Sequence, residues 1–326
     1  MKPVVFFLML SGALCHAQTR LEMPMQGEPL PQAAFELVNK IPASKLACLP
    51  KELPSFAWSK RPRDFSDAAL QKLLDESAFA GTNVASLLPS ATNREKDIKL
   101  TSHDNQDYFI VMPAVGRILI HTTDQSHNYP PPDAVPDFDA LWRQVSDLAR
   151  MFGVSTNDME RRPDGSIHIR KTENTTSHLG GAVKYTSKRS VTVFRSIDGY
   201  LVRALNEDKI ELESGINGRL LDFNFQWPNI EATHTNSVLT VSALMDEIKK
   251  GQVLGDVINE YPPGGISKVE LTDFQVFYYV STMLPYVRRS TTETDIRPMI
   301  EFLATFKAKD GEATEGSLFV PLTQSP

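Results

Sequence analysis

Cysteine is scarce in this sequence, with 2 in 326 residues. So few cysteines exclude a small scaffold that is held together by several disulfide bonds. The 17 glycines show no three-residue repeat, which excludes a collagen-like chain. Basic residues are not in excess either, because 34 Lys and Arg stand against 40 Asp and Glu, for a net charge of -6. This balance argues against nucleic acid as a partner, since binding a phosphate backbone needs a basic surface.

Long hydrophobic runs are absent beyond the first residues of the chain. Lys2 is followed by an apolar run over 4–10 and by a small residue, Ala17, at the end of the segment. This pattern predicts a signal peptide over 1–17 that is cleaved after Ala17. The apolar run is shorter than the roughly 20 residues that cross a bilayer as a helix. We therefore expect an exported protein, periplasmic or secreted, with no transmembrane segment in the mature chain.

Export would leave Cys48 as the single cysteine, so no internal disulfide is expected. Neighbouring residues include no histidine that would favour a reactive thiolate. The sequence leaves the role of Cys48 open.

Prolines and hydrophobic patterns divide the rest of the chain into four parts. Residues 18–64 hold seven prolines, which predicts an extended arm with at most one short helix near 33–40. Its arginines and lysines give it a mild positive character, which is typical of a solvated linker. Residues 65–128 are predicted to form a small α+β unit, and 137–234 a helix plus an antiparallel sheet. A helix plus strands is expected over 238–326, and the sequence leaves open whether this part packs with the preceding unit.

The strongest helix signal is in the segment 138–152, where apolar side chains recur at helical spacing along one face. Asp-Gly and Asn-Gly pairs then separate strand-like runs, which favours tight hairpins. Such pairs occur at Asp164-Gly165, Asp198-Gly199 and Asn217-Gly218. The expected fold class is α+β, with a helix packed on antiparallel meander sheets and this scheme repeated in two or three units.

Catalytic signatures are missing from the sequence. It contains no Gly-x-Ser-x-Gly elbow, no phosphate-binding glycine loop and no His-Glu-x-x-His pair. We therefore expect a protein that is not an enzyme and that uses no cofactor. One alternative stays open: His121, Asp124 and His127 have a spacing at which they could hold a metal ion in a hydrolase.

Aromatic residues gather in the second half of the chain. Phe223, Phe225 and Trp227 alternate, so they share one face of a predicted strand, and Tyr278 belongs to a later aromatic cluster. Such alternation is typical of core packing in a half-buried sheet. The other interpretation is that these four side chains form a face that binds a protein or peptide partner.

The segment 191–202, with Asp198-Gly199 and the following strands up to Trp227, resembles exported PepSY-like domains. In those domains a strand with an aromatic residue and a dipeptide turn precedes an apolar strand, and a second turn precedes the last strand. The likeness includes the helix 138–152 and covers about a third of the chain. Similar modules occur in propeptides of secreted metalloproteases and in extracellular regulators of a cell-wall-sensing histidine kinase. The resemblance implies a cystatin-like α+β fold that binds protein or peptide without chemistry of its own.

Together these features predict an exported, non-catalytic module that binds or regulates an exported protein or peptide. The alternatives are the metal-dependent hydrolase and a structural component of the cell envelope. Neither the identity of the partner nor the oligomeric state follows from the sequence.

Overall fold

The structure is a computed structural model. It describes residues 32–38, 40–42, 46–59, 61–87, 97–123, 134–178, 183–203, 208–250, 254–257, 265–280 and 296–323. The predicted signal peptide lies outside these ranges, so its cleavage stays a prediction. Among the helices that the structure describes, none has the length and apolar character needed to cross a membrane.

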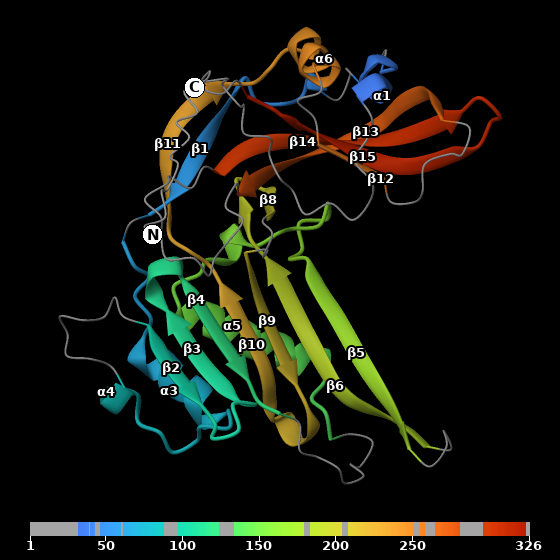
Figure 1. The fold of residues 1–326 in the computed structure, drawn as a ribbon. Helices are drawn as coiled ribbons and strands as arrows, with labels where there is room; N and C mark the ends of the chain where they lie inside the picture. Colours follow the sequence, from blue (N-terminus) through green and yellow to red (C-terminus); the bar gives the residue numbers. More distant parts are fainter. Residues whose placement is uncertain are drawn as a thin grey trace, which may run out of the picture.

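The first of two large sheets has seven strands, all antiparallel, in the order β2-β3-β4-β10-β9-β6-β5 (Figure 1). Along the chain these strands are β2 (Ile98–Thr101), β3 (Tyr108–Met112), β4 (Arg117–His121), β5 (Ile169–His178), β6 (Val183–Phe194), β9 (Lys209–Ser214) and β10 (Leu220–Gln226). Strands β4 and β10 are neighbours although about a hundred residues separate them in sequence. The sheet is therefore held together by long-range pairing.

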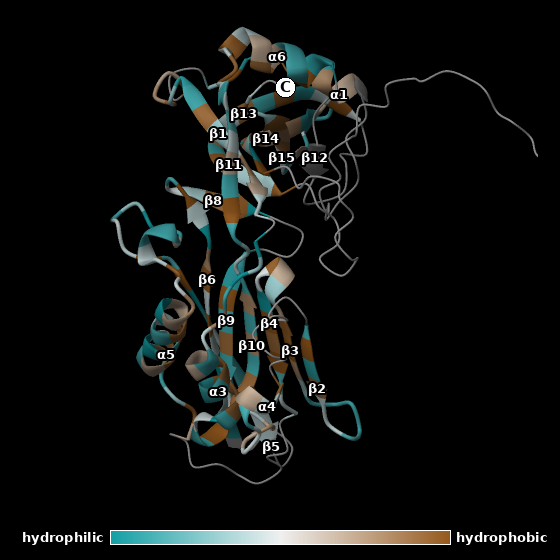
Figure 2. Ribbon diagram, turned by 90° about the vertical axis from the view of Figure 1, so that its left-hand side faces the viewer, coloured by the Kyte–Doolittle hydropathy of each residue, from teal (hydrophilic) through white to brown (hydrophobic). Residues whose placement is uncertain are grey.

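Helices cover one face of this sheet, where α3 (Asp67–Asp75), α4 (Val84–Leu87) and α5 (Phe138–Met151) lie (Figure 2). The longest, α5, begins where Asp137 accepts a hydrogen bond from the Ala140 N–H at 2.7 Å. Its apolar stripe, which includes Leu141, Val145 and Leu148, is fully buried against the sheet. This helix confirms the one predicted from the stripe over 138–152.

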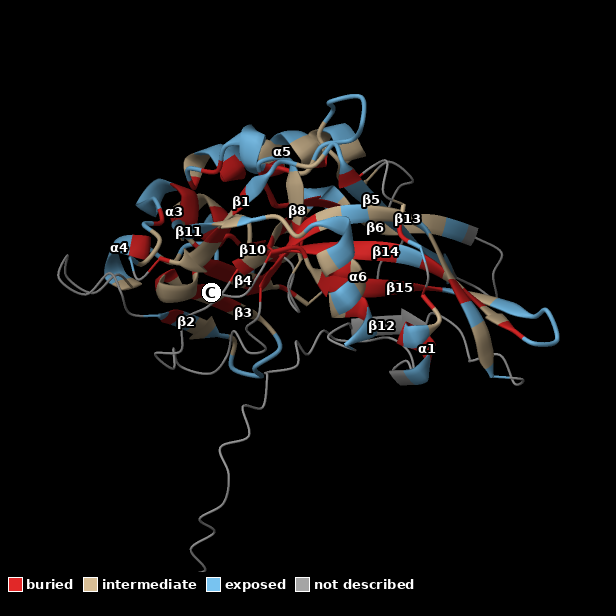
Figure 3. Cartoon of the chain, turned by 90° about the horizontal axis from the view of Figure 1, so that it is seen from above, coloured by how far each residue is buried: buried red, intermediate tan, exposed pale blue. Residues whose placement is uncertain are grey.

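The second sheet contains eight strands and is antiparallel except for the β13–β8 pair. Its main order is β11-β1-β14-β13-β8-β7, and β15 pairs with both β14 and β12. Their bounds are β1 (Glu52–Trp58), β7 (Ser196–Ile197), β8 (Tyr200–Arg203), β11 (Ile230–Ser237), β12 (Leu254–Val257), β13 (Ile266–Val280), β14 (Ile296–Ala308) and β15 (Ala313–Pro321). Helices α1 (Gln32–Glu36) and α6 (Val241–Lys249) lie over this sheet (Figures 1 and 3).

Three short 3₁₀ turns complete the described elements: η2 (Pro113–Val115), η3 (Thr156–Asp158) and η4 (Ile216–Gly218). In two predicted hairpins both turn residues have positive φ. Asp198 and Gly199 have φ of 51° and 84°, and Asn217 and Gly218 have 58° and 74°. These are the conformations that tight turns between twisted strands require.

The predicted α+β class, with a helix on a meander repeated in two or three units, is wrong. The chain is mainly β, with two large sheets and few helices. The expected units 65–128 and 137–234 both supply strands to the seven-stranded sheet, so the boundary between them does not separate two sheets. Turn dipeptides predict pairing only between strands that follow one another along the chain. These sheets also contain pairs of strands that are distant in sequence, such as β4 with β10 and β1 with β11.

The predicted extended arm, 18–64, also needs correction in its described part. A short helix, α1, does lie near the expected position, but 52–58 form β1 inside the second sheet. Pro54 is tolerated there because β1 pairs with β14 at a single position, Phe56 with Ile296. Most backbone N–H groups on the β14 side of β1 therefore have no ladder partner among the described residues, and the missing N–H of Pro54 removes no hydrogen bond there.

Candidate functional site: a pocket between the two sheets

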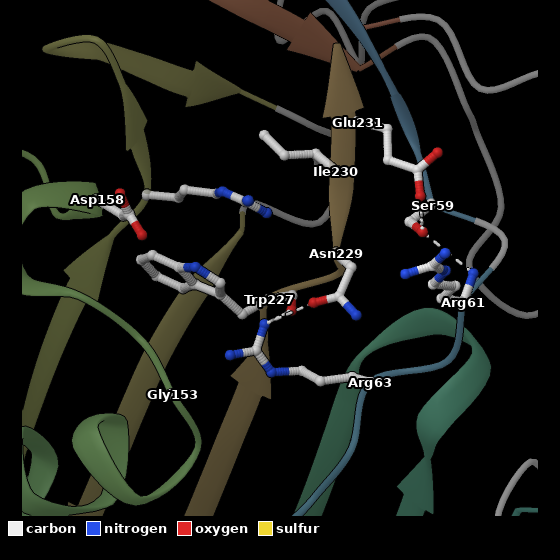
Figure 4. Close-up of a pocket in the computed structure, with 10 residues that line it drawn as sticks. Ser59, Arg61, Arg63, Gly153, Asp158, Trp227, Asn229, Ile230 and Glu231 are labelled. Carbon is white, nitrogen blue, oxygen red and sulfur yellow. Dashed lines mark hydrogen bonds between the residues drawn. The ribbon is translucent and has the colours of Figure 1, made fainter.

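A cavity of about 360 Å³ lies where the chain passes between the two sheets (Figure 4). Four segments line it, each at the end of a strand or helix. The lining residues are Ser59, Arg61 and Arg63 after β1, Gly153 and Asp158 after α5, Arg195 after β6, and Trp227, Asn229, Ile230 and Glu231 at the passage from β10 to β11. Three of the ten lining residues are arginines, whose guanidinium groups favour anions, and two are acidic, Asp158 and Glu231.

Arg63 joins the pocket to the core of the seven-stranded sheet. Its Nη1 donates to the Trp227 carbonyl at 2.9 Å and to Asn229 Oδ1 at 3.3 Å. Its Nη2 donates to the Phe152 carbonyl, and its guanidinium lies 5.4 Å from the centre of the Phe225 ring. The Arg63 side chain therefore holds the end of α5 and the end of β10 together.

Arg195 lies deeper, with 6% of its surface exposed. Its Nη1 donates to the Pro228 carbonyl at 2.7 Å and to Asp208 Oδ2 at 3.2 Å. The guanidinium also lies 5.5 Å from the centre of the Trp227 ring. Buried Nε of Arg195 and buried Oδ1 of Asp208 have no hydrogen-bond partner within the described ranges. The pair is therefore fixed in place while part of its hydrogen-bonding capacity is unused.

Arg61 differs from the other two arginines because its side chain is exposed. Its backbone N–H donates to Ser59 Oγ at 3.1 Å, and Ser59 Oγ in turn donates to the Glu231 carboxylate. The Arg61 guanidinium has no hydrogen bond to any residue that the structure describes. It is therefore available to a ligand without loss of an internal contact.

The charges in the pocket influence one another. The pKa of Arg63 is lowered to about 10, mainly by burial and also by the nearby Arg195 charge, while Asp158 acts in the opposite direction. Burial raises the pKa of Asp208 to about 6, although the Arg195 charge and hydrogen bonds from Arg195 and Gln226 favour its ionised form. Arg63 and Arg195 repel each other, and the carboxylates of Asp158, Glu231 and Asp208 offset part of the positive charge that the arginines bring to the pocket.

The aromatic residues proposed as a partner-binding face do not form one. Phe223, Phe225 and Tyr278 are each 0% exposed, and Trp227 is 2% exposed. Phe223 and Phe225 pack in the core beneath α5, so the core-packing interpretation of their alternation holds. Trp227 borders the pocket, but its ring serves as a wall beneath Arg195. Phe223 and Phe225 lie in the core of the first sheet and Tyr278 in that of the second, so a partner has no access to these three side chains.

The predicted metal-binding group is only partly described. Asp124 and His127 lie outside the described residues. His121 Nδ1 lies 2.7 Å from Asp222 Oδ1, and its ring stacks on Tyr108 with ring centres 5.4 Å apart. Within the part of the chain that the structure describes, no three His, Cys, Asp or Glu side chains lie close enough together to hold a metal.

The pocket was not predicted from the sequence. The sequence pattern places Arg61 and Arg63 in a solvated linker, and Arg195 in the PepSY-like segment. The one available signal was the positive character of the arm, but nothing in the sequence shows that Arg195 lies beside it.

Comparisons with known proteins give no name for this site. No protein-family model matches the sequence, and no curated protein matches it. One similar solved structure is that of an uncharacterized protein from Eubacterium rectale, with a TM-score of 0.41 and 11% identity over 82% of this chain and 83% of that chain. A score of this size does not establish a shared fold, so the function must be argued from the pocket itself.

Proposed function

We propose that this chain is an exported, non-catalytic binding protein that takes an anionic group of a protein or peptide in the pocket between its two sheets. The observation that carries the proposal is the convergence of Arg61, Arg63 and Arg195 on one cavity. Guanidinium groups present several N–H donors in a plane and match the two oxygens of a carboxylate. The PepSY-like resemblance, which implies protein or peptide binding, supports the same class of function.

The division of roles among the arginines also supports binding. Arg63 and Arg195 are held by backbone carbonyls, so their side chains lose little conformational entropy when a ligand binds. Arg61 is exposed and has no internal partner among the described residues, so it can close on a bound anion. The Glu231 carboxylate, which accepts from Ser59, offers an acceptor beside it, which would favour ligands that also carry a donor.

The test uses a fluorescently labelled hexapeptide with three alternating glutamates and, as its control, the same peptide with glutamine. We expect the full chain to bind the glutamate peptide in preference, and more weakly at high salt. Arg61→Gln should weaken binding about tenfold, because one charge-assisted hydrogen bond is lost. Arg143→Gln is the matched control, since Arg143 is an exposed arginine on α5, away from the pocket.

Equal affinity for the two peptides would contradict the proposal. So would an equal effect of Arg61→Gln and Arg143→Gln, because binding would then depend on overall charge and not on the pocket.

A further inference from the structure

The outer edge of β11 is a second feature of the junction. Strand β11 ends the sheet order, and within the described ranges β1 is its only neighbour. Residues 231–235 are exposed on both faces of the strand. An open strand edge offers a row of N–H and C=O groups to which another chain can add as a strand.

The direction of these backbone groups follows from one hydrogen bond and from the register of the β1–β11 pair. The Ser59 N–H donates to the Asn229 carbonyl at 2.8 Å, so that carbonyl points toward β1. In an antiparallel pair the bonded positions alternate, so the N–H and C=O groups of Ile230 and Ala232 point away from β1. These are the groups that an added strand would meet.

Arg195 lies at the end of this same edge. The Pro228 carbonyl accepts from Arg195 Nη1 at 2.7 Å, and Pro228 is two residues before Ile230 on the outward-pointing side of the strand. Beyond it, β9 already pairs with β10 at Lys209 and Gln226. A strand added to β11 therefore cannot continue into the first sheet, and its end must lie against Arg195.

The orientation of the added strand decides whether its amino end or its carboxyl end lies against Arg195. Strand β11 runs away from the pocket, so a chain that pairs antiparallel to it runs toward the pocket and places its carboxyl end there. A carboxylate at that position meets the Arg195 guanidinium, on the side of β11 away from Ser59 and Arg61 (Figure 4). Cross-strand neighbours would be Ile230 and Ala232 on one face and Glu231 on the other, which suits apolar residues alternating with a basic one.

We propose that β11 takes the extended C-terminal segment of a partner protein as an added antiparallel strand, with the terminal carboxylate in the arginine pocket. This rests on the proposed function, because the pocket supplies the anion site, and it names the class of ligand. Backbone pairing along Ile230 and Ala232 gives affinity, and the contact of the terminal carboxylate with Arg195 fixes the register of the added strand.

The test uses a labelled hexapeptide of alternating threonine and valine, with valine last and lysine before it. It is compared with its C-terminal amide and with a form N-methylated at the residues that would pair with β11. Fluorescence anisotropy on the full chain should show that each change weakens binding about tenfold, by loss of the carboxylate contact or of backbone hydrogen bonds.

A variant tests the same point from the protein side. Ala232→Pro removes an outward N–H without removing a bond to β1, so it should weaken binding of the free-carboxylate peptide about tenfold. Ala232→Gly keeps the N–H and is the matched control, with affinity within about twofold of the unchanged protein.

Three results would overturn the inference in different ways. If the N-methylated peptide binds as tightly as the parent while the amide does not, the pocket binds carboxylate without strand addition, and the proposed function stands alone. If the amide binds as tightly as the free acid, the chain end is not what is recognised. Absence of binding by both this peptide and the glutamate peptide would remove both proposals.

Discussion

Trp227 and Gly116 are locked together at the junction of the two sheets. The Trp227 N–H donates to the Gly116 carbonyl at 2.9 Å. Gly116 has a φ of 61°, and a Cβ added to it would lie 2.8 Å from the Trp227 carbonyl oxygen and 2.6 Å from Pro228 Cα. Both of these contacts are with backbone atoms, which cannot move aside as a flexible side chain would. The turn before β4 therefore packs closely against the backbone of Trp227 and Pro228, beside the pocket.

Gly116→Ala should therefore lower the free energy of unfolding by about 3 kcal/mol or more, because a left-handed backbone conformation and a backbone clash add together. Gly165→Ala is the matched control. Gly165 also has a positive φ, 83°, but a Cβ there meets nothing within 4 Å. Its cost should be about 1 kcal/mol, from the backbone conformation alone. Urea unfolding of both variants measures the difference, and equal costs would contradict the close approach.

Substitution of Arg63 should lower the stability of the protein, whereas substitution of Arg61 should leave the stability almost unchanged. Arg63→Ala leaves the carbonyls of Trp227 and Phe152 without their donor, so we expect a loss of about 2–4 kcal/mol in the free energy of unfolding. Arg61→Ala removes an exposed side chain and should change stability by less than about 0.5 kcal/mol. Thermal and urea unfolding would measure both. A destabilisation by Arg61→Ala as large as that by Arg63→Ala would show that the two roles are misassigned.

The buried Asp208 should make stability depend on pH. Its pKa rises from 3.8 to about 6 in the folded chain, so the folded protein keeps a proton that the unfolded chain has lost. The stabilisation from this group is complete below pH 3.8 and is lost as the pH rises through about 6. Relative to Asp208→Asn, which cannot ionise, the unchanged protein should lose about 2 kcal/mol between roughly pH 4.5 and 7.5.

Urea unfolding of both proteins at the two pH values isolates this term, because all other titrating groups are shared. A stability difference that stays constant with pH, or that grows in favour of the unchanged protein at high pH, would contradict the raised pKa.

The Tyr278 hydroxyl should contribute nothing to stability. Its oxygen is buried without a hydrogen-bond partner among the described residues, and burial raises its pKa. Tyr278→Phe should leave the free energy of unfolding unchanged or raise it by up to about 1 kcal/mol. Tyr278→Ala, which also removes the ring contacts with Phe56 and Tyr200, should cost about 4 kcal/mol. A loss of more than about 1 kcal/mol in Tyr278→Phe would reveal a partner for the hydroxyl.

Local elements of the fold could be predicted from the sequence because their signals are local. The stripe over 138–152 predicted α5, since helical spacing and a capping Asp137 lie within one segment. The pair Asp198-Gly199 predicted a tight turn, since few residues adopt positive φ. Phe223 and Phe225 were identified as sharing one face, and that face is the core.

The pairing of distant strands could not be predicted in the same way. Nothing in the residues of β4 indicates that β10 lies beside it, and nothing in β1 indicates β11. The pocket depends on these pairings, because they bring Arg63 and Arg195 to the same junction. A site made by long-range pairing leaves no fixed spacing in the sequence, so no motif marks it.

The position of β1 has a consequence for how the chain acquires its structure. Ser55 in β1 contacts Thr233, which lies 178 positions later. The second sheet therefore cannot close until most of the chain is present, and closing so large a loop is slow. We expect β1 to join late in folding and chains truncated before β11 to leave it unpaired. The pocket between the sheets is complete only when the second sheet has closed, so, if the proposed function holds, binding of the glutamate peptide would report complete folding.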